Sequence, residues 1–156
     1  MGGPDYAELC QLYARYAAAL DAARWDEWPE FFVEDCLYKL IPRENHERGF
    51  PLATLMFESK GMLQDRVYGI RETLFHDPYY QRHVIGAPLI HAATAERITC
   101  EANYAVLRTK LSELPTVFSL GRYIDEVVVT DGGLKFASKL VVYDNELIAN
   151  SIIYPI

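Results

Sequence analysis

Cysteine is scarce in this sequence, and the three that occur are Cys10, Cys36 and Cys100. Because they are odd in number and far apart, they do not form a disulfide framework and are typical of a reducing cytoplasm. The N-terminus has no basic region followed by an apolar core, so no secretory signal is expected. No uninterrupted apolar run approaches the length that spans a bilayer. We therefore expect a cytoplasmic protein.

Positive charge is also in short supply. The 15 Lys and Arg residues stand against 22 Asp and Glu residues and leave a formal net charge of -7. Binding to a polyanion requires clustered Lys and Arg side chains that displace counterions. We therefore expect neither a nucleic acid nor an anionic membrane as a partner.

The motifs of several common catalytic sites are missing as well. The sequence has no Gly-rich phosphate loop, no GxSxG nucleophile elbow and no CxxC pair. A Rieske cluster needs two Cys and two His residues in closely spaced pairs, and no Cys here has a His within three residues. The chain is therefore expected not to hold such a cluster by itself.

What is present fits one domain, which we place at residues 1–156 because no repeat, low-complexity tract or linker divides the chain. Aromatic residues make up 13% of the sequence, with eleven Tyr and seven Phe. Such an excess is typical of an interface or of a lined cavity.

Helical periodicity dominates the first half of the chain. Asp5 and Glu8 resemble a capping box, and apolar residues then recur at helical spacing as far as Leu20. Asp26 is expected to cap a second short helix, which would carry the bulky side chains of Trp25, Trp28, Phe31 and Phe32. The remaining predictions for this half are a strand over 37–41, a polar loop over 43–51 and a third helix over 59–73.

Alternation with a period of two takes over in the second half and predicts strands. One buried face would consist of Ile98, Cys100, Ala102, Tyr104 and Val106. Strands over 117–129 and 134–143 would form a hairpin around the glycines of residues 131–133. Because long antiparallel strands twist and coil, we predict an α+β fold in which a cone-like curved antiparallel sheet packs with the N-terminal helices.

Histidines and arginines supply the candidates for chemistry. The segment with His76, Asp77, His83 and His91 lacks the spacing of a metal site, so surface or partly buried histidines are the preferred interpretation. In the alternative of a cavity enzyme, His83 would act in acid–base catalysis with Asp65 or a Tyr. Arg66, Arg71 and Arg82 could bind a carboxylate, although internal ion pairs, such as Arg82 with Asp65 or Glu72, are equally compatible with the sequence.

Several segments resemble the small, or beta, subunits of Rieske-type aromatic-ring-hydroxylating dioxygenases, and the likeness covers nearly the whole chain. Trp28-Pro29, Phe31-Phe32 and PREN at 42–45 resemble the passage from helix to strand in those subunits. The salicylate 5-hydroxylase small subunit in particular is similar in ESK at 58–60, DRVYG at 65–69, HDPYYQRH at 76–83 and NSIIYPI at 150–156. Terephthalate- and anthranilate-type enzymes resemble the chain in the same way.

This resemblance implies a fold like that of nuclear transport factor 2 and ketosteroid isomerase. It implies a large (alpha) oxygenase subunit as partner, which would carry a Rieske 2Fe-2S cluster and a mononuclear iron and receive electrons from NAD(P)H through a reductase. The implied assembly is a trimer of heterodimers, with a homotrimer as a possible form of the chain alone. Since such small subunits are regarded as structural, no catalytic residue, cofactor ligand or metal ligand is expected in this chain.

We therefore interpret the chain as a non-catalytic subunit that supports assembly of a hydroxylase acting on an aromatic acid such as salicylate, in aromatic compound catabolism. The open alternative is a stand-alone cavity enzyme of the isomerase or dehydratase type, or a small-molecule-binding protein of the same fold. Candidates for partner binding or structural support are Arg66, Tyr79, Tyr80, Arg82, His83, Ile152, Ile153 and Tyr154. Alternation would place Tyr80 and Arg82 on one face of a strand and Tyr79 and His83 on the other. The apolar tail is expected to dock on the sheet or on a neighbouring subunit.

Overall fold

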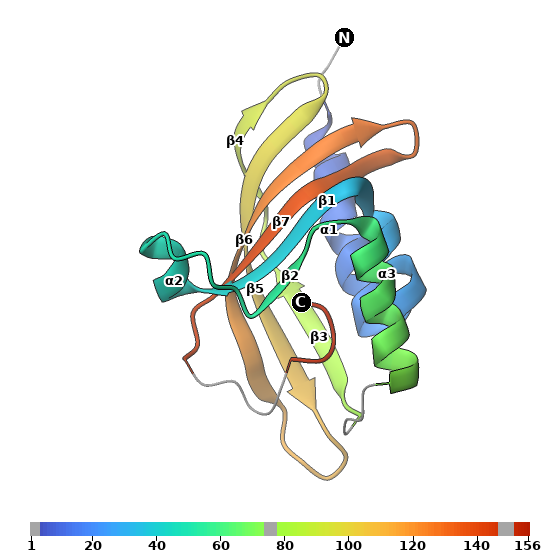
Figure 1. Ribbon diagram of the computed structural model, residues 1–156, viewed down its shortest axis with the longest axis vertical. Helices are drawn as coiled ribbons and strands as arrows, with labels where there is room; N and C mark the ends of the chain where they lie inside the picture. Colours follow the sequence, from blue (N-terminus) through green and yellow to red (C-terminus); the bar gives the residue numbers. More distant parts are fainter. Residues whose placement is uncertain (1–3, 74–77, 147–151) are drawn as a thin grey trace.

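The computed structural model describes residues 4–73, 78–146 and 152–156 of the chain. The helical elements are α1 (Tyr6–Asp21), the 3-10 turns η1 (Trp25–Glu27) and η2 (Pro29–Phe31), α2 (Arg43–Glu47), α3 (Lys60–Tyr68) and the π-helical turn η3 (Gly69–Thr73). The strands are β1 (Phe32–Pro42), β2 (Leu55–Phe57), β3 (Tyr80–Ile85), β4 (Leu89–Ala93), β5 (Arg97–Thr109), β6 (Thr116–Thr130) and β7 (Gly133–Tyr143). Figure 1 shows a strongly curved sheet with α1 and α3 on one side of it.

Helix α1 confirms the predicted first helix, including its start. The Asp5 side chain accepts a hydrogen bond from the backbone N–H of Ala7, which satisfies one of the free donors of the first turn. The face toward the sheet is buried and consists of Leu9, Leu12, Tyr13, Tyr16, Ala19 and Leu20. The amphipathic pattern therefore placed this helix correctly against the sheet.

The predicted second helix is wrong, because two short 3-10 turns occupy its place and neither has a side-chain cap. The carboxylate of Asp26 instead accepts a hydrogen bond of 2.7 Å from Arg71. Proline at position 29 has no N–H to donate and starts η2, so the chain turns twice before β1 begins. The predicted loop over 43–51 likewise contains the short helix α2.

The strands form one sheet in the order β2-β1-β7-β6-β5-β3, and β4 pairs with β5 beside this path. All pairs are antiparallel except β1 with β7, which run parallel. The sheet is therefore mixed, although an antiparallel sheet was predicted. The expected buried face of β5 is confirmed, from Ile98 to Val106.

Two glycines allow the long hairpin β6–β7 to turn and to coil. Gly133 closes the turn with φ of +100°, a backbone conformation that a side chain would strain. At the other end, a Cβ atom on Gly121 would lie 1.9 Å from the carbonyl oxygen of Val142. Only glycine allows the two strands to approach this closely where the sheet bends around the core.

The core between α1 and the sheet is rich in aromatic rings. Tyr16 makes edge contacts with the rings of Phe31, Phe32, Tyr123 and Phe136, with centroids 5.4 to 6.4 Å apart.

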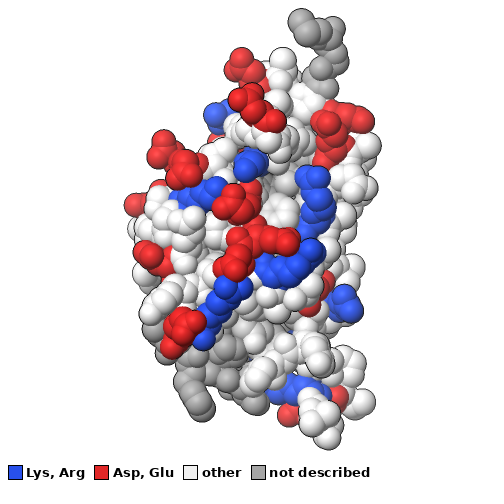
Figure 2. Space-filling view, turned by 90° about the vertical axis from the view of Figure 1, so that its right-hand side faces the viewer, with Lys and Arg blue, Asp and Glu red and all other residues white. Residues whose placement is uncertain are grey.

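Among the described residues, no helix is long and apolar enough to cross a membrane. The face that carries α1 and α3 bears interspersed acidic and basic side chains (Figure 2).

Candidate functional site

The interior of the cone contains a buried ion pair. The side chains of Lys139 on β7 and Asp125 on β6 are fully buried, and Lys139 Nζ lies 2.8 Å from Asp125 Oδ2. The Tyr13 hydroxyl donates a hydrogen bond to the same oxygen. The ammonium also lies 3.6 Å from the centroid of the Tyr123 ring. The carboxylate therefore contacts the Tyr13 hydroxyl, and the ammonium contacts the Tyr123 ring.

Burial and mutual attraction act in opposite directions on this pair. Burial raises the pKa of Asp125, and the ammonium of Lys139 lowers it. Burial lowers the pKa of Lys139, and the carboxylate raises it. Burial also raises the pKa of the Tyr13 hydroxyl, so this group remains a hydrogen-bond donor. Inside the core, the charge of Lys139 thus stabilises that of Asp125, and the charge of Asp125 stabilises that of Lys139.

The C-terminal segment 152–156 closes part of the same interior. The hydroxyls of Tyr16 and Tyr38 both donate to the carbonyl oxygen of Ile156, at 3.0 and 2.9 Å. Arg66 on α3 donates to the carbonyl oxygens of Ile152 and Ile153, at 2.9 and 3.1 Å. These contacts confirm that the tail docks on its own chain.

Aromatic stacking completes the attachment of the tail. Tyr154 stacks on Trp25 with centroids 4.6 Å apart and lies 4.8 Å from the ring of Tyr79. Tyr79 in turn lies under the guanidinium of Arg108, 5.1 Å from the centroid of its ring. Burial raises the pKa of Tyr79 to about 12. Tyr79 and Tyr154 therefore stabilise the interior rather than the outer surface.

A second buried polar pair joins α1 to the edge strand β3. His83 Nδ1 lies 2.7 Å from Asp21 Oδ1, and the backbone N–H of His83 donates to the same carboxylate at 3.0 Å. His83 Nε2 is buried and has no hydrogen-bond partner among the described residues. The pair covers part of the free edge of β3, an edge that native proteins commonly protect.

The opposite face of β3 points away from α1 and belongs to an apolar surface. Antiparallel partners share a face of the sheet, and the register aligns Arg82 with Leu107 and Leu107 with Val117. We define the outer patch as the exposed apolar residues Tyr80, Val84, Leu107, Val117 and Leu120. The loop between β5 and β6 extends it with Leu111 and Leu114, which are 96% and 85% exposed.

A hollow of about 370 Å³ lies at the edge of this patch. Its lining includes Tyr80, Arg82 and Leu107, together with Pro115 from the loop. Tyr80 is 82% exposed, and Arg82 forms no ion pair within the described residues. The alternative of an internal ion pair of Arg82 with Asp65 or Glu72 is therefore wrong, because both acidic residues are described and neither forms an ion pair with it.

The histidine cluster does not form a metal site in the described part of the chain. His91 is exposed and lies 3.5 Å from Glu101, whereas His83 is buried against Asp21. His76 and Asp77 lie outside the described residues. No group of three or more His, Cys, Asp or Glu side chains could hold a metal ion among the residues that are described. Cys100 contacts the Tyr13 hydroxyl at 3.5 Å.

The pair of Lys139 and Asp125 was not predicted from the sequence. A regular alternation from Phe136 would place Lys139 on the outer face, but the register shifts between Phe136 and Ser138. This bulge turns Lys139 inward. The exposed leucines of the loop over 110–115 were also missed, although Leu111 and Leu114 were visible as apolar residues in a polar turn.

The comparison with known families agrees with this geometry. Residues 4–139 match the model of the SnoaL-like domain. The small subunit of anthranilate 1,2-dioxygenase from Burkholderia cepacia is 34% identical over 149 residues, which are 96% of this chain and 92% of the relative. The subunit beta 1 of the terephthalate 1,2-dioxygenase terminal oxygenase component from Comamonas sp. is 29% identical over 88% of this chain and 90% of its own.

A solved structure gives the same result. A beta subunit assigned to an aromatic-ring-hydroxylating dioxygenase of Novosphingobium aromaticivorans superposes with a TM-score of 0.88 at 33% identity, over 96% of this chain and 95% of its own. The chain therefore belongs to the SnoaL-like domain family and, within it, to the small subunits of aromatic-ring-hydroxylating dioxygenases. The resemblance and the α+β cone predicted from the sequence are confirmed.

Proposed function

We propose that this chain is a non-catalytic subunit that supports the assembly of a ring-hydroxylating oxygenase, and that its outer patch contacts the large subunit. The observation that carries the proposal is the contrast between the two faces of the sheet. The inward face of the sheet is filled by aromatic rings, the tail and the Lys139–Asp125 pair, whereas the outward face of β3, β5 and β6 exposes large apolar side chains. Contiguous exposed apolar surface marks an interaction site.

The residues of the hollow have the chemistry of an interface centre. Tyr80 offers a large, stiff apolar ring with a polar end, and Arg82 offers five N–H donors to a partner carboxylate. Both residue types are enriched among those that contribute most to binding. Leu107 lies beside Arg82 in the ladder and Val117 beside Leu107, and both would exclude water from the contact of Arg82. The patch therefore offers Arg82 as an exposed charged anchor next to apolar side chains.

The proposal assigns the redox chemistry to the partner. The large subunit would hold a Rieske 2Fe-2S cluster and a mononuclear iron, with electrons from NAD(P)H through a reductase, in a trimer of heterodimers. The support from this chain is that no group of three or more His, Cys, Asp or Glu side chains among its described residues could hold a metal ion. The aromatic carboxylates in the names of the two relatives, anthranilate and terephthalate, support an aromatic acid such as salicylate as the substrate of the complex.

Reconstitution with a large oxygenase subunit tests the assembly role. Arg82→Ala should weaken binding by about 2 kcal/mol, a roughly thirtyfold rise in Kd, and Tyr80→Ala should have a similar effect. Turnover per assembled complex should stay unchanged. Matched controls are Arg48→Ala directly after α2 and Tyr68→Ala on α3, which remove the same residue types from other exposed positions. Equal Kd values for all four variants and the wild type would refute the proposed contact surface.

One observation favours a second function. His83 is held by Asp21 through one ring nitrogen and leaves the other without a partner, as in a general base that awaits a substrate. In this alternative the chain is a cavity enzyme of the isomerase or dehydratase type. His83→Ala in the reconstituted complex separates the two, because loss of turnover with intact assembly would assign chemistry to this chain. Unchanged turnover per complex would support a structural role for the pair.

A further inference from the structure

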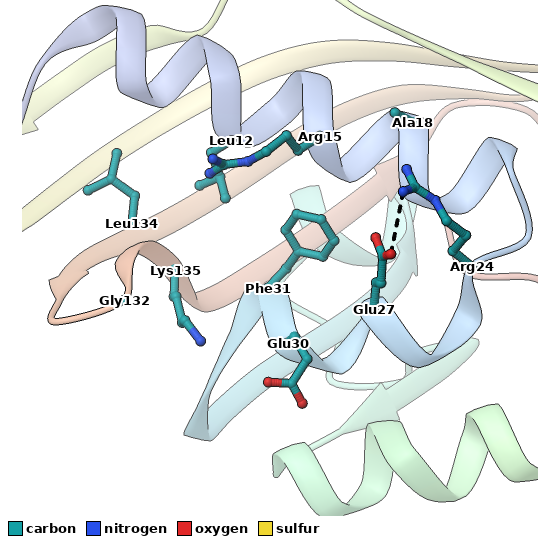
Figure 3. A pocket seen from close by; sticks show the side chains of 10 residues that line it. All are labelled: Leu12, Arg15, Ala18, Arg24, Glu27, Glu30, Phe31, Gly132, Leu134 and Lys135. Atoms are coloured by element: carbon teal, nitrogen blue, oxygen red, sulfur yellow. Dashed lines mark hydrogen bonds and ion pairs between the residues drawn. The ribbon is translucent and has the colours of Figure 1, made fainter.

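A groove between α1, the turns η1 and η2, and the tip of the β6–β7 hairpin lies apart from the outer patch. It has a volume of about 380 Å³, and its apolar lining includes Leu12, Phe31 and Leu134. A second hollow of about 300 Å³ continues it along α1 and shares Arg15 and Leu134 with it. Figure 3 shows the ring of Phe31 in the middle of the groove. The space is thus an elongated slot with an apolar centre.

Charged side chains line the rim of this groove, and its two carboxylates already have partners. Glu27 lies 3.4 Å from Arg24, and Glu30 accepts a hydrogen bond of 3.0 Å from Lys60 on α3. Arg15 and Lys135 also line the groove, but neither forms an ion pair within the part of the chain that the structure describes. The groove therefore has two cationic groups that form no ion pair with a carboxylate of the described residues, while Glu8 lines the continuing hollow together with Arg15.

The two cations line the groove from different elements. In Figure 3, Arg15 extends from α1 and Lys135 from the hairpin, and the charged ends of both lie on the same side of the Phe31 ring. A guanidinium can bind both oxygens of a carboxylate, and an ammonium adds a point charge. An apolar ring of the ligand would contact Phe31 and Leu134. An anion with an apolar body satisfies both parts of this site, whereas a neutral molecule or a small inorganic anion satisfies only one.

We propose that this groove binds an aromatic monocarboxylate on the small subunit itself. The site goes beyond the assembly role, because it lies on the face of α1 and the hairpin tip and does not involve the outer patch. Arg15 and Lys135 bind the carboxylate, and Phe31 and Leu134 contact the ring. The groove then holds a molecule of the same chemical class as the proposed substrate of the complex.

Titration of the full chain with benzoate, followed by calorimetry or by NMR shifts, tests the site. Benzamide keeps the ring without the charge, and acetate keeps the charge without the ring. Benzoate should bind saturably, and the other two should bind at least tenfold more weakly. Arg15→Gln and Lys135→Gln should each raise the Kd for benzoate about tenfold, equivalent to about 1.4 kcal/mol, while Arg48→Gln should leave it unchanged. Circular dichroism of each variant checks that the fold is intact.

Three results would overturn the proposal. The first is the lack of saturable benzoate binding by the wild-type chain. The second is binding that persists unchanged in the double variant of Arg15 and Lys135, or that benzamide equals. The third is that the chain does not bind benzoate and that the variants of Arg15 and Lys135 weaken its binding to the large subunit. The groove would then be a contact surface for a protein. The first two results leave the assembly role of the outer patch intact, since neither measurement involves the large subunit.

Discussion

Substitution of Lys139 by Met offers a sharp test of the buried pair. Met is of similar length and can remain packed among the rings of Tyr123 and Phe136, which lie 3.6 and 4.2 Å from the ammonium. The change removes the cation from Asp125, whose side chain is fully buried. Breaking a buried pair by removing one partner costs about 3–5 kcal/mol. Since a domain is stabilised by about 5–15 kcal/mol in total, a large fraction of its stability should be lost.

The double variant Lys139→Met with Asp125→Leu separates the buried charge from the loss of packing. With both charges removed, most of the lost stability should return, because replacing a buried pair by apolar residues is often neutral or stabilising. The remaining deficit should be about 1–3 kcal/mol, since the Tyr13 hydroxyl loses its acceptor. Urea unfolding followed by tryptophan fluorescence measures each free energy. A single variant within 1 kcal/mol of wild type, or a double variant as unstable as the single, would refute the reasoning.

The pH dependence of the single variant provides an independent check. Burial raises the pKa of Asp125, and in the variant no ammonium opposes this effect. A carboxyl group with a raised folded-state pKa destabilises the fold progressively as the pH rises above its unfolded value, about 3.9. The stability difference between variant and wild type should therefore be small near pH 4 and should grow toward pH 7. A difference that is constant over this range would show that Asp125 carries no uncompensated charge in the variant.

Three further predictions concern the tail and the sheet. Deletion of residues 152–156 should cost several kcal/mol, at about 1.5–3 kcal/mol for each of the buried side chains of Ile152, Tyr154 and Ile156, and an unchanged melting temperature would contradict this. Arg66→Met should cost about 1.5–3 kcal/mol in urea unfolding through the lost hydrogen bonds to the tail, with Arg48→Met as a neutral control. Gly121→Ala should cost about 1–3 kcal/mol or more, because its methyl group would overlap the Val142 carbonyl, and wild-type stability would rule out this close approach.

Periodic elements of the fold were predictable from the sequence because a single buried face determines them. The apolar residues of α1 recur with the helical period, and those of β5 recur every second residue. The hairpin was predictable from Gly133, whose positive φ a turn of this kind requires. In these segments local preference and burial favour the same structure.

Features that depend on strand pairing were not predictable in the same way. The parallel pairing of β1 with β7 joins segments about one hundred residues apart, and no local pattern encodes it. The bulge before Ser138 reverses which residues face inward, so alternation counted from Phe136 gives the wrong side for Lys139. The groove near Arg15 combines residues from α1, the two 3-10 turns and the hairpin, and its composition depends on how these elements pack.

The alternation of strand β3 explains why Tyr80 and Arg82 are exposed whereas His83 is buried. This alternation places Gln81 and His83 against α1, where the Gln81 amide donates to the carbonyl of Leu20, and it leaves Tyr80 and Arg82 on the outside. Because α1 occupies one face, only the other remains for a partner. The sequence could predict the alternation but not which face α1 covers. Since Arg82 and His83 lie on opposite faces, substituting each alone separates contact with a partner from events inside the cone.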